Sequence, residues 1–199
     1  MKNIVYEIGQ SLYINATNKC SNSCIFCVRN NKEFVYGDLW LDSEPTSEDV
    51  ISRLKEYDLS KYAEVVFCGY GEPTYRMDVI EDVSSFAHSK GLKTRINTNG
   101  HANLINKKDV APIIVRCIDT IGISLNEVDS KAYDDICLPM YDKAFEEMLA
   151  FAKECVELGG NVIFSVVDII GPKKIEKAKE IAASIGATLR VREEIKWEV

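Results

Sequence analysis

Short apolar segments alternate with longer amphipathic segments along almost the whole chain, and this alternation constrains the fold more than any other feature. Six short segments have the apolar composition of strands: 11–16, 63–68, 93–97, 120–125, 162–167 and 188–191. The segments between them place apolar residues at helical spacing. Strands that alternate with helices are joined by right-handed crossovers, so the pattern predicts a parallel sheet with helices outside it.

The number of strand–helix units limits how far such a sheet can close. A complete eight-unit barrel usually takes about 250 residues, whereas this chain has 199 residues and six such units. We therefore predict an α/β fold, a partial (β/α)6 TIM-like barrel, in a single domain that spans residues 1–199. The fifth strand, 162–167, is apolar enough to be buried on both faces.

Helix boundaries can also be assigned from the sequence. Thr46, followed three residues later by Asp49, resembles a capping box at the start of the first long helix. Gly91 fits the end of the second helix. A short helix is expected near 107–116, and a polar stretch at 126–139 leads from the fourth strand to a long amphipathic helix.

Composition narrows the class of protein. Hydrophobic residues make up 46% of the chain and charged residues 28%, as in ordinary soluble globular proteins. The formal net charge of −7 argues against a general nucleic-acid binder. No signal peptide is visible, and no apolar run approaches the roughly 18 residues of a membrane span. We expect a cytoplasmic protein with reduced thiols and no membrane partner.

Three of the seven cysteines, Cys20, Cys24 and Cys27, lie close together just after the first predicted strand. Thiolates are the usual ligands of iron–sulfur clusters, and a complete set would be four. A loop this short can place three thiolates around one face of a cubane cluster, and no fourth cysteine lies nearby. One iron would then remain open to a ligand that is not protein.

Two other uses of these cysteines are possible. A structural zinc site needs four ligands, but the only two histidines, His88 and His101, show no ligand-pair spacing. A disulfide framework needs an oxidising compartment, which nothing in the sequence indicates. The other cysteines show no second cluster spacing, and packing is the common role of such residues: Cys68, Cys117, Cys137 and Cys155.

The spacing C-x-x-x-C-x-x-C, with Phe26 before the last cysteine, resembles the radical S-adenosylmethionine (SAM) superfamily. The resemblance implies that Cys20, Cys24 and Cys27 hold a [4Fe-4S] cluster whose open iron binds SAM through its amino and carboxylate groups. One electron from the cluster would cleave SAM to methionine and a 5′-deoxyadenosyl radical, which takes hydrogen from a substrate. Phe26 would lie near the adenine.

A second motif, Gly69-Tyr70-Gly71-Glu72-Pro73, follows the second predicted strand. Glycines let a backbone approach a ligand closely, and a carboxylate beside them can pair with an ammonium group. Such a stretch can also be an ordinary turn. In the superfamily the corresponding stretch is usually Gly-Gly-Glu and binds the SAM amino group, which implies that role for Gly69, Gly71 and Glu72. Tyr70 departs from the small residue expected there.

The ends of the later strands carry further candidates, because ligands of such barrels meet the loops at the carboxyl ends of the strands. By resemblance, Thr98 and Asn99 lie near SAM, although Asn-Gly is also a frequent turn signal. Ser124 and Asn126 could hydrogen-bond the ribose hydroxyls, or could be an ordinary solvated strand end. Val167 ends the fifth strand, where apolar backbone in the superfamily borders adenine.

Two stretches are candidates for contact with substrate. The first is the loop 29–40, with Arg29, Lys32, Phe34, Tyr36 and Trp40, and the second is 133–139. Within the second, Cys137 could be a hydrogen donor or a covalent handle, but a reactive thiol must be exposed and have a low pKa. A packed, inert cysteine is the simpler interpretation.

Several stretches, including Leu12 to Cys20, Leu39-Trp40-Leu41 and Tyr133 to Pro139, resemble a small radical SAM family named for its linkage to TatD-type hydrolases. Leu138 stands where that family would have a basic residue. Two other enzymes remain alternatives, a glycyl-radical-enzyme activase and an enzyme similar to 7-carboxy-7-deazaguanine synthase. A non-catalytic iron–sulfur electron carrier is the alternative outside the enzyme class. The expected partners are an unknown substrate, a reductant such as flavodoxin or ferredoxin, and a TatD-type hydrolase.

Overall fold

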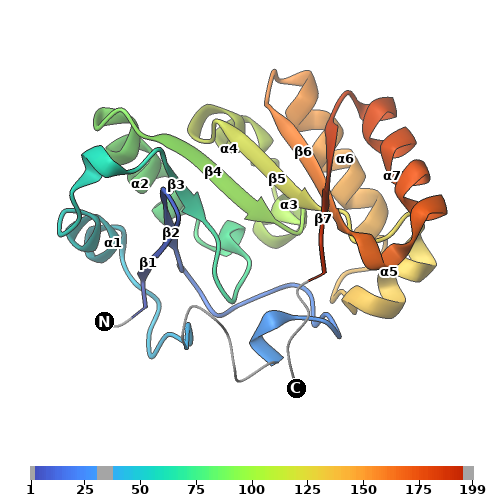
Figure 1. The fold of residues 1–199 in the computed structure, drawn as a ribbon, viewed down its shortest axis with the longest axis horizontal. Helices are drawn as coiled ribbons and strands as arrows, with labels where there is room; N and C mark the ends of the chain where they lie inside the picture. The colour runs from blue at the N-terminus through green and yellow to red at the C-terminus, as the bar shows by residue number, and fades with distance from the viewer. Residues whose placement is uncertain (1–2, 31–37, 195–199) are drawn as a thin grey trace.

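A computed structural model describes residues 3–30 and 38–194 of the chain (Figure 1). A single seven-stranded sheet has the strand order β1-β2-β3-β4-β5-β6-β7. Its strands are β1 Val5–Ile8, β2 Ser11–Ile14, β3 Glu64–Phe67, β4 Lys93–Thr98, β5 Thr120–Ser124, β6 Val162–Val167 and β7 Thr188–Arg192. All neighbours from β2 to β7 are parallel. The predicted six-stranded parallel sheet of a partial barrel is therefore confirmed.

The first strand was not predicted. β1 pairs antiparallel with β2, with Val5 opposite Ile14 and Ile8 opposite Ser11. The two strands are joined through Gly9, whose φ of +59° lies in the left-handed region that glycine adopts without steric cost. This hairpin gives the edge strand of the parallel sheet a partner.

The helices are α1 Ser47–Leu54, α2 Met77–Ser89, α3 Ala102–Asn106, α4 Ala111–Cys117, α5 Ser130–Cys137, α6 Ala144–Glu157 and α7 Pro172–Ile185. Single-turn helices are η1 Val28–Asn30, η2 Leu59–Lys61, η3 Pro73–Tyr75 and η4 Asp168–Ile170. The expected short helix near 107–116 corresponds to α4, which begins later than expected, and α3 before it was not predicted. The polar stretch 126–139 contains a helix, α5, which the sequence analysis missed. The capping box of Thr46 and Asp49 is present at α1.

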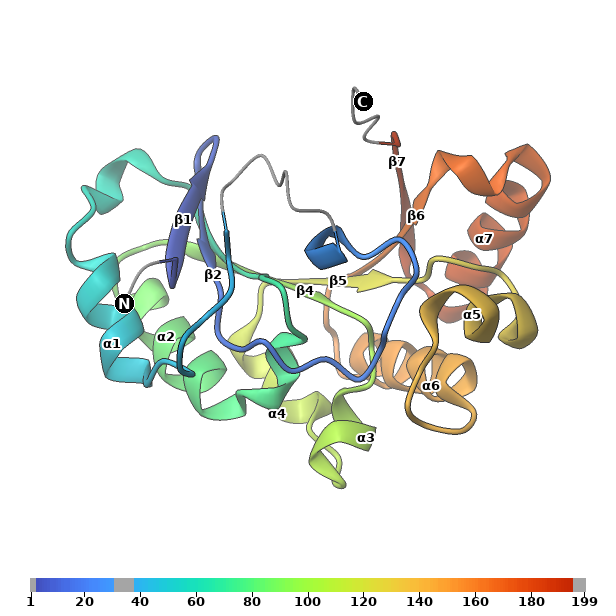
Figure 2. The same ribbon diagram turned by 90° about the horizontal axis from the view of Figure 1, so that it is seen from below.

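The larger helices all cover one face of the sheet, as the view in Figure 2 shows. Along that face α1 packs on α2, α2 on α4, α4 on α6 and α6 on α7. The strand residues that point toward them are fully buried: Leu12, Ile14, Val65, Phe67, Ile96, Ile121, Ile123, Phe164 and Val166. The hydrophobic core therefore lies between the sheet and this helical layer. No helix in the described part of the chain is both long and apolar enough to cross a membrane.

The other face of the sheet is concave and half-open. Alternate residues along β6, namely Ile163, Ser165 and Val167, are only half-buried there. The expectation that 162–167 is buried on both faces was therefore wrong, because this barrel is open and no second layer of helices in the described residues covers its inner face. Side chains from several strands share this face through the register of the sheet.

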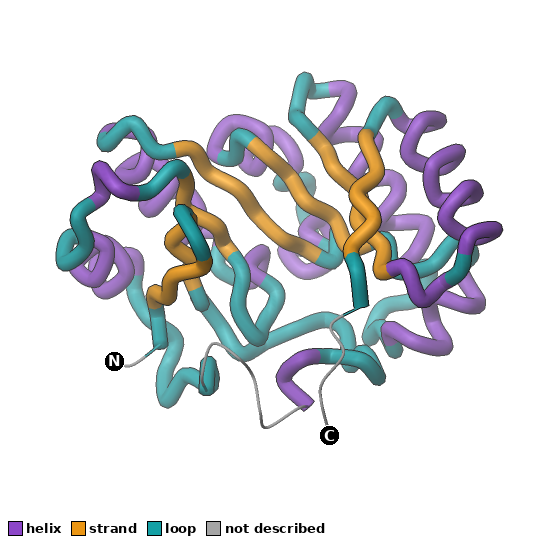
Figure 3. Tube along the Cα trace, viewed as in Figure 1, coloured by secondary structure: helices purple, strands orange, loops and turns teal. Residues whose placement is uncertain are grey.

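The segment after β2 crosses the carboxyl edge of the sheet. Figure 3 shows it as a long loop that runs from β2 along the strand ends and reaches the side of the molecule where α5 lies. This segment contains the three clustered cysteines. The candidate site is therefore assembled where this loop meets the ends of the parallel strands.

Candidate functional site

Backbone hydrogen bonds dock the cysteine segment, residues 20–27, onto the end of α5. The amide of Ser23 donates to the carbonyl of Cys137 at 3.1 Å, and the amide of Ile25 donates to the carbonyl of Ile136 at 3.0 Å. In the opposite direction, the amide of Met140 donates to the carbonyl of Ser21 at 2.9 Å. The last carbonyls of a helix have no partner within it. The cysteine segment therefore satisfies the end of α5, and α5 in turn holds the segment in place.

The three cysteine thiols are free and half-buried. Burial and the charge of Glu72 raise the pKa of Cys20 to about 12, and burial raises the pKa of Cys27. The contact with the Cys137 thiol is the main reason that the pKa of Cys24 is raised. A bound metal reverses this effect, because a coordinating thiol is deprotonated.

The donor set fits a cluster better than a single ion. No group of three or more His, Cys, Asp or Glu side chains converges closely enough to hold one metal ion in residues 3–30 and 38–194. This disfavours a structural zinc site, which needs four converging ligands. A cubane cluster spreads its thiolate ligands over separate irons, so it does not need Cys20, Cys24 and Cys27 to converge on one ion.

Glu72 is a buried carboxylate, 3% exposed, at the point where β3 ends and η3 begins. Its Oε1 accepts from the Thr98 hydroxyl at 2.7 Å and from the hydroxyl and amide of Thr74 at 2.8 and 3.1 Å. Its Oε2 accepts from the Asn99 amide at 2.7 Å. Burial raises the pKa of Glu72, and these hydrogen bonds oppose the rise. The structure thus brings three predicted site residues, Glu72, Thr98 and Asn99, into direct contact.

The two glycines of this motif are required for packing against the chain itself. A Cβ on Gly71 would lie 2.3 Å from the Thr17 carbonyl oxygen and 2.5 Å from that of Lys19. A Cβ on Gly69 would lie 2.0 Å from the Asn15 side-chain oxygen. The amide of Glu72 also donates to the Lys19 carbonyl at 2.7 Å. These contacts lock the Glu72 turn to the stretch that leads into Cys20, so ligand contact by the glycines stays a prediction.

Asn99 connects Glu72 to the cysteine segment. Its side-chain amide donates to the Ser21 hydroxyl at 2.8 Å and lies 3.9 Å from the Cys20 sulfur. Cys20 also accepts the amide of Asn22 at 3.4 Å. The residues predicted at the ends of the second and third parallel strands therefore hold the first cysteine of the segment.

A chain of buried polar side chains, which the sequence analysis did not identify, lies behind the cysteine segment. The Ser21 hydroxyl lies 3.1 Å from His101 Nδ1, and His101 Nε2 lies 3.3 Å from the Tyr133 hydroxyl. Tyr133 accepts from the Asn22 side-chain amide at 3.0 Å. Burial lowers the pKa of His101 to about 4, so its ring is neutral at neutral pH. His101 follows the Asn-Gly turn after β4, and its position there was the only sequence signal for it.

The other predicted residues lie around the same strand ends. Ser124 and Val167 are half-buried at the ends of β5 and β6. Asn126 is 8% exposed and donates to the Cys137 sulfur at 3.4 Å, so in this structure it faces the cysteine and its ribose contact stays a prediction. Phe26 is 46% exposed on the cysteine segment, so its aromatic face is available to a ligand.

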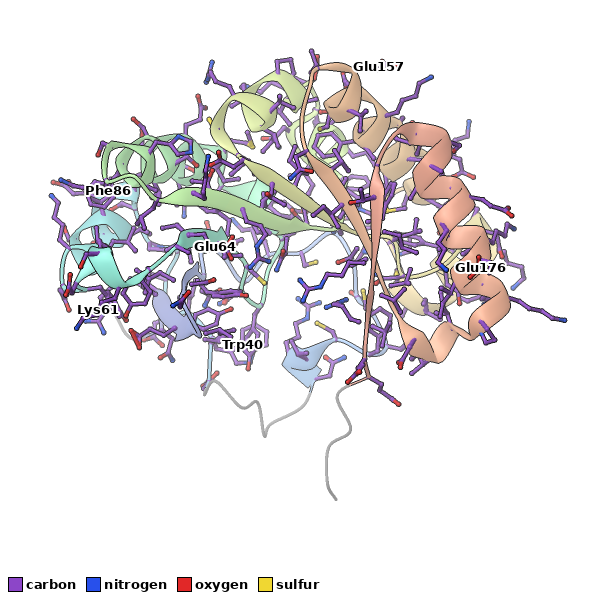
Figure 4. All side chains as sticks on the ribbon, turned by 45° about the horizontal axis from the view of Figure 1, so that its top comes forward. Trp40, Lys61, Glu64, Phe86, Glu157 and Glu176 are labelled. Atoms are coloured by element: carbon purple, nitrogen blue, oxygen red, sulfur yellow. The ribbon has the colours of Figure 1, made fainter. Side chains whose placement is uncertain are left out.

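The candidate substrate loops are only partly described. Arg29 donates to the Asn22 carbonyl at 3.1 Å, and it therefore supports the cysteine segment. Trp40, labelled in Figure 4, is 48% exposed. Its ring packs edge-on against that of Tyr70, with the ring centroids 5.3 Å apart. Cys137 is fully buried, as expected of a packed cysteine. The predictions for Lys32, Phe34 and Tyr36 fall outside the described residues.

Comparison with known proteins assigns the chain to a protein family. Residues 14–185 match the family model described as "Radical SAM superfamily". Two curated relatives are an Fe-coproporphyrin III synthase of Methanosarcina barkeri, 28% identical over 57% of the chain, and an uncharacterized protein, MJ0907, of Methanocaldococcus jannaschii, 27% identical over 85% of the chain. The chain covers 26% and 56% of these relatives.

The fold has a close counterpart among solved structures. SuiB of Streptococcus suis bound to S-adenosylmethionine superposes with a TM-score of 0.74 at 20% identity. The superposition covers 98% of this chain and 43% of SuiB. At this level of identity the likeness shows a shared fold.

Proposed function

Because the chain belongs to the radical SAM superfamily, we propose that it binds a [4Fe-4S] cluster and SAM and acts as a hydrogen-abstracting enzyme. The observation that carries this proposal is the arrangement of three thiols, from Cys20, Cys24 and Cys27, on a segment docked across the ends of the parallel strands. When bound, the cluster would supply the electron that cleaves SAM to methionine and a 5′-deoxyadenosyl radical. The protein would bind and orient the cofactors and the substrate, and it would exclude water from them.

The three cysteines would ligate three irons, and Asn99 and Asn22 would orient the Cys20 sulfur by donating to it. Second-shell hydrogen bonds of this kind tune a metal centre and fix its ligands. The neutral His101 and the Tyr133 hydroxyl support Ser21 and Asn22 from behind. Together these contacts would keep the segment in one conformation when the cluster is bound.

Glu72 would accept the ammonium group of SAM. A carboxylate has about four lone-pair positions. In this structure Oε1 receives three hydrogen bonds and Oε2 receives one, from the Asn99 amide. Oε2 therefore keeps capacity for a further donor, and an ammonium would also compensate the buried charge. Ser124 and Asn126 would contact the ribose, and Phe26 and Val167 would border the adenine.

This chain covers only part of its relatives, so their substrates are not assigned to it. The enzyme subclass is therefore also a proposal. The motifs quoted above favour the TatD-linked radical SAM family, with a TatD-type hydrolase as functional partner and flavodoxin or ferredoxin as reductant in the cytoplasm. A glycyl-radical-enzyme activase and an enzyme similar to 7-carboxy-7-deazaguanine synthase remain alternatives. An electron carrier would need neither Glu72 nor Ser124.

The test is formation of 5′-deoxyadenosine by anaerobically reconstituted, reduced protein supplied with SAM. We expect product from the wild type and none from Cys24→Ala. Glu72→Gln keeps the size of the side chain but removes its charge, so we expect at least about tenfold less product. Cys117→Ala removes a cysteine of α4, away from the site, and should leave the yield unchanged.

The same measurement separates the alternatives. A bound cluster without SAM cleavage would indicate an electron carrier. Zinc in place of iron, in protein purified without oxygen, would overturn the radical mechanism.

A further inference from the structure

The concave face of the sheet carries two arginines that have no counter-charge within the described part of the chain. Arg190 and Arg192 lie two residues apart on β7, so both point to the same face of the sheet. Neither guanidinium has an ion-pair or hydrogen-bond partner among the side chains of residues 3–30 and 38–194. For a chain with a net charge of −7, an unpaired positive pair on an inner face is unexpected.

A third arginine on this face, Arg95, has a counter-charge. Arg95 on β4 forms an ion pair with Glu64 at 2.8 Å, and it also donates to Tyr13 and to Asn97. Glu64 is labelled on β3 in Figure 4. The positive charge of Arg95 is therefore used within the protein, whereas the charges of Arg190 and Arg192 are not.

The register of the sheet aligns Arg190 with two hydroxyl groups. Ser124 on β5 pairs with Ser165 on β6, and Ser165 pairs with Arg190 on β7. Paired residues of neighbouring parallel strands point to the same face, so these three side chains form a row about 10 Å long. Neither serine hydroxyl has a partner among the described residues. Val167 pairs with Arg192, which places Arg192 at the carboxyl edge beside this row.

Electrostatic effects agree with the placement of Arg192 on the inner face, within reach of the end of β3. Burial raises the pKa of the Cys68 thiol at the end of β3, whereas the charges of Arg95 and Arg192 lower it. Burial and the neighbouring charge of Arg190 lower the pKa of Arg192, and only the Cys68 thiol opposes this. Arg192 keeps an exposed surface, and no carboxylate of residues 3–30 and 38–194 is among the groups that shift the pKa of its guanidinium group. The pair of like charges would thus be stabilised by an anion from outside.

We propose that Arg190 and Arg192, together with the hydroxyls of Ser124 and Ser165, bind an anionic group of the substrate, a carboxylate or a phosphate. Guanidinium groups present planar, paired donors that match both oxyanions. The acidic residues near the end of β7, Asp168, Glu193 and Glu194, line a hollow whose lining includes neither arginine. Since Ser124 is also the residue proposed to contact the SAM ribose, the anion would be held next to SAM. This inference rests on the proposed function and adds the chemical class of the substrate.

Charged side chains on an edge strand can have another role, which is to prevent pairing between sheets of two molecules. That role requires charged side chains at the edge, but it needs neither the row of hydroxyl groups nor a bound ligand. Anion binding by the reconstituted protein distinguishes the two roles.

The experiment is calorimetric titration of the anaerobic, cluster-loaded protein with inorganic phosphate and, separately, with succinate. Chloride keeps the ionic strength constant in both titrations. We expect saturable binding of at least one anion, weakened about tenfold or more by Arg192→Gln and by Arg190→Gln, because each removes a charged hydrogen-bond donor. Arg116→Gln removes an arginine from α4 and should not change the affinity. Binding of phosphate alone supports a phosphorylated substrate, and binding of succinate alone supports a carboxylate.

Three results would overturn the proposal: no saturable binding of either anion, binding that the two β7 variants leave unchanged, or loss of SAM affinity in those variants. The last result would assign the arginines to the SAM carboxylate. If the wild type binds the anion but forms no 5′-deoxyadenosine, the proposed enzyme activity fails and the anion site stands.

Discussion

At the scale of single residues, Glu72 and His101 are two buried titratable groups that hold the cysteine segment through different neighbours. Glu72 acts through Asn99, whose side chain reaches Ser21 and Cys20. His101 acts through Ser21 and Tyr133. Both side chains are almost fully buried, so their charge states are linked to folding.

His101 predicts how stability depends on pH. Burial lowers its pKa from 6.5 to about 4, so the folded protein binds a proton at lower pH than the unfolded chain does. The stability that His101 contributes is therefore complete above pH 6.5 and is lost as pH falls from 6.5 toward 4. The full loss would be about 3 kcal/mol in the free energy of unfolding.

Urea unfolding of the reduced, cluster-free protein at pH 7.0, 6.0 and 5.0 measures this effect. In His101→Gln the fall in the free energy of unfolding between pH 7.0 and 5.0 should be smaller, although the variant is less stable at pH 7.0. An equally steep fall in this variant would show that another group is responsible.

At the scale of elements, α5 organises the site, because the end of this helix pairs with the cysteine segment. The helix is held at its start by Asp129, whose carboxylate accepts from the Ala132 amide at 2.9 Å. At its end Leu138 adopts a left-handed conformation with φ of 45°, which turns the chain toward Met140. Loosening α5 should therefore affect the cysteines, although no α5 residue is a predicted iron ligand.

Removing the cap of α5 tests this coupling. Asp129→Ala should lower stability by about 1 kcal/mol and should also make the reconstituted protein lose iron faster to a chelator. Thr46→Ala removes a similar cap from α1, which lies at the opposite end of the sheet from α5 in Figure 1. We expect a comparable loss of stability from Thr46→Ala, measured by urea unfolding, with no change in the rate of iron release. Equal rates of iron release in the two variants would argue against a role of α5 in holding the segment.

At the scale of the whole molecule, the barrel is open and its sheet has two edges. At one edge β1 pairs with β2, and the nearby Ile4 and Val5 are buried. At the other edge β7 is largely exposed and carries Arg190 and Arg192. Exposed strand edges invite pairing with other chains, and charged residues reduce that risk. The edge of the parallel sheet at β2 is thus covered by a further strand, β1, whereas β7 has no further strand beside it among the described residues.

This arrangement predicts the effect of removing β1. A chain that begins at residue 10 would expose the backbone edge of β2. We expect it to associate at concentrations where the full chain is monodisperse, as measured by sedimentation velocity. If the shortened chain stays monodisperse and equally stable, β1 has no protective role.

The sequence by itself determined the parallel architecture, and it predicted the residues that carry the chemistry of the site. Both depend on local patterns, namely apolar periodicity, glycine positions and the spacing of Cys20, Cys24 and Cys27. The cap of α1 was equally readable, because Thr46 and Asp49 contact each other within one turn. The inner-face alternation of β6 was missed, because Ser165 is the single polar residue among apolar neighbours and only the open barrel leaves its side uncovered.

Only the tertiary structure decided which distant residues meet at the site. His101, Tyr133 and Ser21 are far apart in sequence, and each is unremarkable in its own segment. They form one buried chain because the ends of parallel strands converge on the same edge of the sheet. The same is true of Ser124, Ser165 and Arg190, whose alignment depends on strand register. Register and burial are properties of the assembled sheet, so a reading of local patterns could name the candidates but could not show which of them share a face.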